Sequence, residues 1–153
     1  MTDLATYLPG TWRVDRALED AALGAGRFRG SATFTPEGDG LAWVETGHMT
    51  LGRYDGPARR TLRIVPDSYG WAVEFADGRP FHRLDLASGE HCAFEHPCGA
   101  DRYAGKFAVR GPDEFEIGWA VSGPAKAQRL TGRYVRDSLS ASSCSRKPAA
   151  SST

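Results

Sequence analysis

Hydrophobic and polar residues alternate along most of the chain, in short segments separated by glycine and proline. Side chains two residues apart lie on the same face of a strand, so this alternation predicts β-strands with one buried face. The segments are also rich in aromatic and β-branched residues, which favour strands. We expect about ten strands, over residues 11–16, 28–35, 41–50, 60–65, 71–76, 81–86, 90–96, 102–109, 114–121 and 128–136.

The loops between these segments are short, and those at 77–80, 87–90 and 110–113 suit hairpins. Consecutive hairpins form an antiparallel meander, and such a sheet avoids exposed edges by closing on itself. We therefore predict an all-β fold, a single antiparallel up-and-down β-barrel of about eight to ten strands. A β-sandwich is the competing architecture, because periodicity alone does not exclude it.

Helical composition is confined to the start of the chain. Residues 16–24, "RALEDAALG", predict a short helical lid after the first strand, which Gly24 would end. Such a lid is usual in small ligand-binding barrels and favours the barrel over the sandwich. A single helical turn is also expected within residues 3–8.

The C-terminal segment differs in composition from the rest of the chain. Residues 138–153 are rich in serine, alanine and proline and carry almost no large apolar side chain. Such a segment buries too little surface to offset its ordering entropy. We predict a barrel domain over residues 1–137 and a disordered tail over residues 138–153, which contains Cys144.

Composition and charge narrow the range of partners. The chain has 153 residues, with 19 basic and 19 acidic side chains, so no basic excess predicts binding to nucleic acid or to an anionic membrane. No apolar run approaches the ~20 residues that span a bilayer, and the N-terminus does not resemble a secretory signal. Three cysteines are too few for a disulfide scaffold. We expect a cytoplasmic protein, a monomer or a homodimer.

Several titratable side chains are predicted to point into the barrel. Alternation places His82, His96 and Tyr103 on inward faces and Asp101 near a mouth. Each of these residues also has a purely structural interpretation. His82 would be an ordinary core or rim histidine, and His96 would cap the end of a strand. Tyr103 would bond a backbone carbonyl, and Asp101 would form an Asx-turn. A filled core rarely keeps so many such groups, because each needs a partner once it is buried. A cavity that holds water or a ligand accommodates them better.

The expected ligand is a small, mostly apolar organic molecule with a polar or ionisable group. Aromatic walls with a few polar groups are typical of small-molecule sites. Lys126 follows the turn "SGP" and would attract an anionic group at a mouth, unless it is simply a solvated lysine. The candidate ligand-binding residues are Arg16, Trp43, Glu45, Trp71, Phe75, Trp119 and Lys126.

Acid–base chemistry without a cofactor suits this set of residues. His96 or His82 would accept a proton, Tyr103 would donate one, and Asp101 would hold the imidazole tautomer. The reaction would be an isomerisation, cyclisation, dehydration or hydrolysis of a small molecule. The alternative is a non-catalytic ligand carrier or sensor, including a haem carrier with His82 or His96 as the iron ligand.

Two further chemistries remain open around "EHPCGADRY" (residues 95–103). His96 and Cys98 would share a metal ion with another histidine, although the paired Cys-x-x-Cys couples of zinc fingers are missing. Cys98 would also serve as a nucleophile if the His96 imidazole reached its thiol. Phosphate-binding glycine loops, dinucleotide fingerprints and serine nucleophile elbows do not occur in the sequence.

Two resemblances support the barrel. "LPGTWRVDR" resembles the Gly-x-Trp opening of lipocalins and other calycins, in which the tryptophan closes the barrel base against a basic residue of the last strand. The resemblance implies that Trp12 pairs with Arg133 or Arg129. Nearly the whole ordered chain is similar to an uncharacterised family of bacterial and fungal proteins, through "GTWRVDR", "DGRPFHRLDL", "HPCGADRYAG" and "GPAKAQRLTGRYVR". That second resemblance implies a single barrel and brings no activity.

Overall fold

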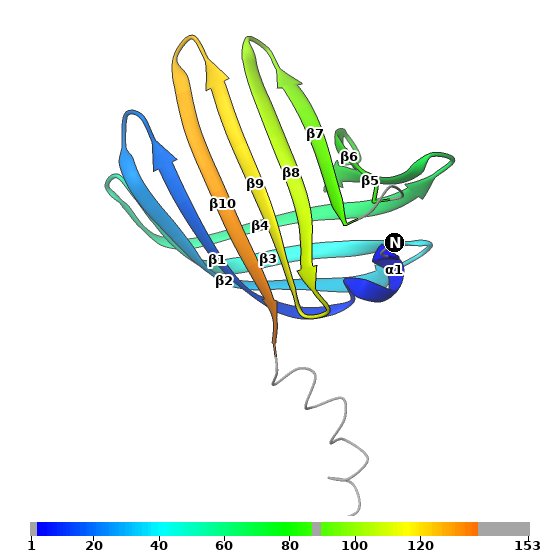
Figure 1. The fold of residues 1–153 in the computed structure, drawn as a ribbon. Coiled ribbons are helices and arrows are strands. Elements are labelled where there is room, and N and C mark those ends of the chain that lie inside the picture. The colour runs from blue at the N-terminus through cyan, green and yellow to red at the C-terminus, as the bar shows by residue number, and fades with distance from the viewer. Residues whose placement is uncertain (1–2, 87–89, 138–153) are drawn as a thin grey trace, which may run out of the picture.

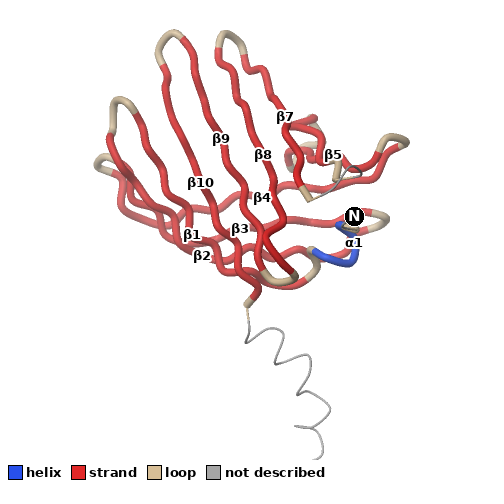
Figure 2. The backbone as a smooth tube through the Cα atoms, in the orientation of Figure 1, coloured by secondary structure: helices blue, strands red, loops and turns tan. Residues whose placement is uncertain are grey.

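Strands make up nearly all of the described backbone, with one short helix (Figure 2). The computed structural model describes residues 3–86 and 90–137. The predicted tail over residues 138–153, with Cys144, lies outside the described residues. The elements are α1 (Leu4–Tyr7), β1 (Gly10–Asp20), β2 (Gly24–Glu37), β3 (Gly40–Leu51), β4 (Tyr54–Asp67), β5 (Gly70–Phe75), β6 (Pro80–Leu84), β7 (His91–Cys98), β8 (Asp101–Gly111), β9 (Glu114–Gly123) and β10 (Lys126–Arg136).

The strands form one continuous antiparallel sheet in the order β6-β5-β4-β3-β2-β1-β10-β9-β8-β7. Chain neighbours pair everywhere except between β6 and β7, and β1 pairs with β10, so the sheet curls into a nearly closed barrel (Figure 1). Among the described strands, β6 and β7 are the two edges of the sheet, and no backbone ladder joins them to each other. We call this junction the seam. The predicted up-and-down barrel is confirmed, and one continuous sheet excludes the sandwich.

The two ends of the barrel are built differently. The closed end carries α1, the start of β1, and the turns that join β2 to β3, β4 to β5 and β8 to β9. The open end carries the turns that join β1 to β2, β3 to β4, β5 to β6, β7 to β8 and β9 to β10.

Helix α1 plugs the closed end. Its Asp3 N-cap accepts a hydrogen bond from the backbone of Ala5, and Leu4 and Leu8 are fully buried against the barrel core. The Tyr7 hydroxyl donates to the carbonyl oxygens of Gly111 at 2.8 Å and Glu114 at 3.0 Å. The helical turn expected within residues 3–8 is therefore confirmed.

Trp12 closes the base of the barrel, as the calycin resemblance implies. It is fully buried, and its indole N–H donates to the Leu8 carbonyl at 2.9 Å. Its basic partner is Arg136, whose guanidinium lies 4.2 Å from the indole centroid. The expected partners Arg133 and Arg129 are wrong, because Trp12 pairs in register with Arg136.

The predicted helical lid after the first strand is also wrong. Residues 16–20 continue β1, and a turn joins Asp20 to β2. The segment pairs on both sides, with β2 and with β10. Two ladders of backbone hydrogen bonds outweigh a helical preference that amounts to a few tenths of a kcal/mol per residue. In the described part of the chain, no helix is long and apolar enough to cross a membrane.

Candidate functional site

Interior side chains are fully buried at the closed end and more exposed near the open end. Large side chains at the closed end, including Trp12, Phe34, Phe115 and Tyr134, are no more than 2% exposed. Aromatic and imidazole side chains that face the interior near the open end are only partly buried; they are Phe75, Phe81, His82, His96, Tyr103 and Trp119. Solvent therefore reaches the inner wall from this end.

A buried carboxylate lies midway along the barrel. Glu45 on β3 is 1% exposed, and among the described residues it is the one buried charged side chain. It accepts hydrogen bonds from Arg16 at 2.8 Å and from the Trp43 indole at 2.9 Å. Arg60 on β4 adds a hydrogen bond at 3.1 Å, and the Tyr134 hydroxyl adds another. This cluster of five side chains is called the Glu45 network below.

The network carries a net positive charge. Burial by itself would raise the pKa of Glu45, but Arg60 and Arg16 outweigh it and lower this pKa to about 2. Burial raises the pKa of Tyr134 to about 12 despite the opposing effect of Arg16. At neutral pH the carboxylate is charged and the phenol is neutral, so two guanidiniums face one negative charge.

The two inward histidines close the seam. The His96 ring N–H at Nδ1 donates to the Phe81 carbonyl of β6 at 2.9 Å. His82 on β6 stacks on Phe94 of β7, with centroids 3.8 Å apart and planes 13° apart. The His82 Nδ1 bonds the carbonyl of Arg83 at 2.7 Å. Side chains thus replace the missing ladder between β6 and β7.

Both imidazoles present Nε2 as their remaining ring nitrogen. Each Nδ1 bonds a backbone carbonyl, so Nδ1 carries the proton and Nε2 carries the lone pair in the neutral ring. Among the described residues, neither Nε2 has a protein hydrogen-bond partner, and neither is buried without one. Two hydrogen-bond acceptors are therefore available near the open end.

Aromatic rings surround these imidazoles. Phe81 stacks on Trp119 at 5.2 Å and on Phe75 at 4.6 Å, and it lies edge-on to His96 at 5.1 Å. Gly105 on β8 makes room for this group, because a Cβ there would lie 2.2 Å from the Phe94 ring and 2.8 Å from the Trp119 ring.

The rim residues of "EHPCGADRY" separate into two groups. Tyr103 faces inward, with its ring 5.8 Å from that of His96. Its hydroxyl accepts a hydrogen bond from Lys126 Nζ at 3.1 Å, and Asp101 lies 4.0 Å from the same ammonium. Asp101 does not orient His96, because the Phe81 carbonyl does so; the expected role of this carboxylate is wrong.

The structure thus brings His82, His96 and Tyr103 together at the open end, and it places Asp101 and Lys126 on the rim beside them. Arg16, Trp43 and Glu45 lie deeper, in the Glu45 network. Trp71 lies at the closed end, paired in register with Pro66 and Leu84. Cys98 is exposed in the β7–β8 hairpin. Within the described ranges, no group of three or more His, Cys, Asp or Glu side chains is arranged to hold a metal ion.

Sequence reasoning missed Arg60 and Phe81. The alternation around Arg60 signals its position, because Leu62 and Ile64 on the same face are buried. Phe81 gives no such signal. The register between β5 and β6 shifts after Val73, so Phe81 and His82 both contact the Trp119 ring although they are adjacent in sequence.

The pKa of His82 predicts an acid-sensitive barrel. Burial, with smaller effects of Arg60 and His96, lowers this pKa from 6.5 to about 4. Between pH 6.5 and pH 4 the unfolded chain binds more protons at this residue than the folded chain does. The contribution of neutral His82 to the free energy of unfolding is therefore fully present above pH 6.5 and is lost as the pH falls toward 4. The contribution is about 3 kcal/mol at most.

Chemical denaturation at a series of pH values measures this contribution. His82→Phe keeps the ring stack on Phe94 and should lose less stability than the wild type between pH 6.5 and 4. His91→Gln, at an exposed position on the same sheet, should follow the wild-type slope. Parallel curves for all three proteins would contradict the lowered pKa of His82.

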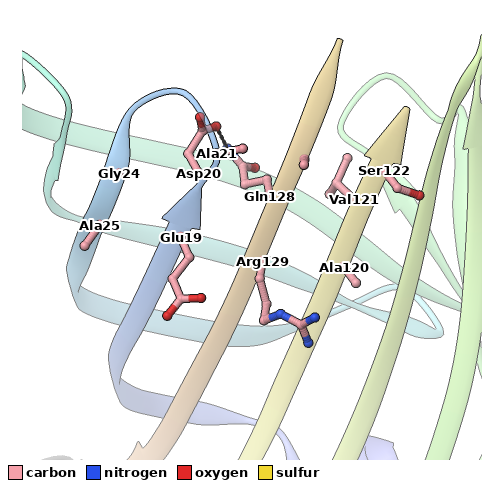
Figure 3. Close-up of a pocket in the computed structure, with 11 residues that line it drawn as sticks. Glu19, Asp20, Ala21, Gly24, Ala25, Ala120, Val121, Ser122, Gln128 and Arg129 are labelled. Atoms are coloured by element: carbon pink, nitrogen blue, oxygen red, sulfur yellow. Dashed lines mark hydrogen bonds between the residues drawn. The ribbon is translucent and has the colours of Figure 1, made fainter. Parts of the chain in front are cut away.

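A hollow on the outside of the barrel is a weaker candidate site. It encloses about 630 Å³ beside the β1–β2 turn and β9–β10, and Figure 3 shows the side chains that line it. Its Asp20 carboxylate already accepts hydrogen bonds from the Ala22 and Leu23 amides and from Gln128. This carboxylate therefore stabilises the β1–β2 turn.

One solved structure supports the architecture, and a second is reported beside it. The S-type phycobiliprotein lyase CPES from Guillardia theta superposes with a TM-score of 0.57 at 9% identity, over 84% of this chain and 88% of that one. A redesigned beta barrel, mFAP0, bound to DFHBI gives a TM-score of 0.45 at 21% identity, over 86% of this chain and 100% of that one. At such identities the likeness to the lyase establishes the fold alone.

Sequence comparison identifies the family. No curated protein matches the chain. The profile of a family of unknown function, DUF6314, matches residues 8–136, which include every strand of the barrel. The chain belongs to this family of unknown function.

Proposed function

We propose that the barrel binds a small, mostly apolar organic molecule through its open end. The observation that carries this proposal is the contrast between the two ends: the aromatic core is fully buried at the closed end, whereas Phe81, His82 and Trp119 are only partly buried near the open end. A ligand that covers these rings removes apolar surface from water, which contributes about 25 cal/mol per Å².

Polar groups near the rings would orient the ligand. The Nε2 atoms of His82 and His96 accept hydrogen bonds, and the Tyr103 hydroxyl and Lys126 ammonium donate them. A few polar groups among aromatic walls are typical of small-molecule sites. The fold of the Guillardia theta lyase, which its name connects with phycobiliproteins, is compatible with this proposal.

The neutral fluorophore N-phenyl-1-naphthylamine tests the proposal. Its emission rises in apolar surroundings, so titration gives an affinity directly. We expect saturable binding, weakened about tenfold or more in Trp119→Ala, since a lost aromatic contact of about 1.4 kcal/mol corresponds to that factor. Circular dichroism of the variant verifies that the barrel remains folded.

Tyr69→Ala is the matched control. Tyr69 is 81% exposed near the closed end, so removal of its ring should leave the affinity unchanged. Equal affinity in wild type and folded Trp119→Ala, or an equal loss in Tyr69→Ala, would contradict binding at the open end.

A second candidate is a cofactor-independent acid–base enzyme acting in the same place. It is favoured by the neighbouring rings of His96 and Tyr103 and by the Lys126 ammonium bonded to the phenol. His96 would accept a proton and Tyr103 would return one to an isomerised, cyclised, dehydrated or hydrolysed product. If so, Tyr103→Phe abolishes turnover of the identified substrate while the barrel still binds it; unchanged turnover would leave a carrier or sensor.

Haem carriage is the third outcome for the same histidines. A histidine that ligates a metal usually donates a hydrogen bond from its other ring N–H to a carbonyl or carboxylate. His82 and His96 each have such a hydrogen bond from Nδ1. A Soret band in the purified or haem-titrated protein that disappears in His82→Phe or His96→Gln would select this function over the other two.

The proposal also covers the cellular compartment and the oligomeric state. The described cysteines, Cys92 and Cys98, are free thiols, which supports a reducing compartment such as the cytoplasm. The Trp12–Arg136 pair supports a place among the calycins. We expect a monomer or a homodimer that binds neither nucleic acid nor membrane.

A further inference from the structure

We propose that the ligand is an organic anion, a carboxylate or sulfonate on an apolar body, and that Arg60 binds its charged group. This inference rests on the proposed function and names the chemical class of the ligand. The contacts that carry it lie in the Glu45 network, below the aromatic rings of the open end.

The charges inside the barrel do not balance. Arg16 and Arg60 both bond Glu45, and Glu45 is the one buried acidic side chain in the described ranges. Both guanidiniums remain charged at any physiological pH. One positive charge is therefore left over on the inner wall, where the surrounding protein screens it less than water would.

Of the two guanidiniums, that of Arg60 is the one that can reach a ligand. The Arg16 side chain is 13% exposed, and its Nη2 donates to both Glu45 and Tyr134. The Arg60 side chain is 38% exposed, although it bonds a carboxylate that is 1% exposed. Among the described residues no group accepts a hydrogen bond from Arg60 Nη1. Arg60 therefore combines a fixed position with a free donor.

The Arg60 guanidinium also lies beside an aromatic ring. Arg60 lies over the Trp43 ring, 5.4 Å from its centroid, and its charge contributes to the low pKa of His82 on β6, two strands away in the sheet. An anion bonded to Arg60 would extend its apolar part toward Phe81 and Trp119. Guanidinium groups bind carboxylates and sulfonates through charge-assisted hydrogen bonds, stronger than neutral ones.

A pair of matched fluorophores tests the charge preference. N-phenyl-1-naphthylamine is neutral, and 1-anilinonaphthalene-8-sulfonate has the same ring system with one negative charge. We expect the wild-type barrel to bind the sulfonate at least tenfold more tightly. Arg60→Gln should remove most of this preference, measured as the ratio of the two affinities in the same variant.

Two variants serve as controls. Arg59→Gln removes the same charge from the neighbouring residue, which is exposed, and should keep the wild-type preference. Arg60→Lys retains the charge and should keep part of the preference. It also provides the comparison if Arg60→Gln does not fold.

Each outcome separates this inference from the function on which it rests. If neither probe binds, the proposed function fails. If both probes bind with equal affinity, or if the preference survives in Arg60→Gln, the barrel binds small molecules but the anion assignment is overturned. If Arg59→Gln loses the preference as Arg60→Gln does, surface charge explains it and the assignment is overturned as well.

Discussion

Glu45→Gln should lower the free energy of unfolding by about 3–5 kcal/mol, the usual result of removing one partner from a buried ion pair. Glutamine has nearly the same shape, so the change isolates the charge. The variant leaves Arg16 and Arg60 without their shared counterion, and an amide NH₂ group replaces one of the two acceptor oxygens, so that donor faces donor there. Urea denaturation measures the loss.

The pH dependence of unfolding tests whether the Glu45 charge causes this loss of stability. Because the pKa of Glu45 is about 2 when folded and 4.5 for the reference carboxyl, its contribution is present above pH 4.5 and is lost as the pH falls toward 2. Glu45→Gln should lack this loss. Glu114→Gln, which removes a partly exposed partner of the exposed Arg133, should change stability little. A Glu45 variant as stable as the wild type would show that the buried charge contributes nothing to the fold.

Trp12→Ala should destabilise the barrel by a similar amount, about 3–5 kcal/mol, as large-to-small changes of buried aromatic residues do. The indole is fully buried between α1 and the barrel. It contacts Phe115 edge-on at 4.7 Å and lies under the Arg136 guanidinium. Its loss opens a void at the closed end and removes the hydrogen bond to Leu8.

Trp71→Ala is the control, because it makes the same truncation at a less buried position. Trp71 also lies at the closed end but is only partly buried, so its truncation should cost clearly less. Thermal or urea unfolding of both variants measures the difference. Equal costs, or a Trp12 variant within about 1 kcal/mol of wild type, would contradict the view that Trp12 anchors this end.

The alternation of hydrophobic and polar residues predicts much of the barrel, because it indicates which side chains of each strand face the core. The inward directions of His82, His96 and Tyr103 follow from the period of two, and the register of β7 with β8 pairs His96 with Tyr103. The same rule applied to β4 would have placed Arg60 inside with Leu62 and Ile64. A charged residue on an apolar face was the available signal.

Other features depend on contacts that local patterns do not encode. The seam joins β6 to β7 through side chains, so the bonding of His96 to the Phe81 carbonyl is not visible in either strand alone. Residues 16–24 have helical composition, but two neighbouring strands hold residues 16–20 extended. The partner of Trp12 depends on the register between β1 and β10, which the Gly-x-Trp signature does not specify.

The most direct test of binding at the open end is a residue-resolved titration. Backbone amide ¹H–¹⁵N spectra of the isotopically labelled barrel, recorded with increasing N-phenyl-1-naphthylamine, report which residues sense the ligand. We expect saturable shifts concentrated at Phe81, His82, His96, Tyr103 and Trp119. Shifts confined to the outer face of β8 and β9, around Ala104, Lys106 and Gly118, or no saturable shifts at all, would contradict it.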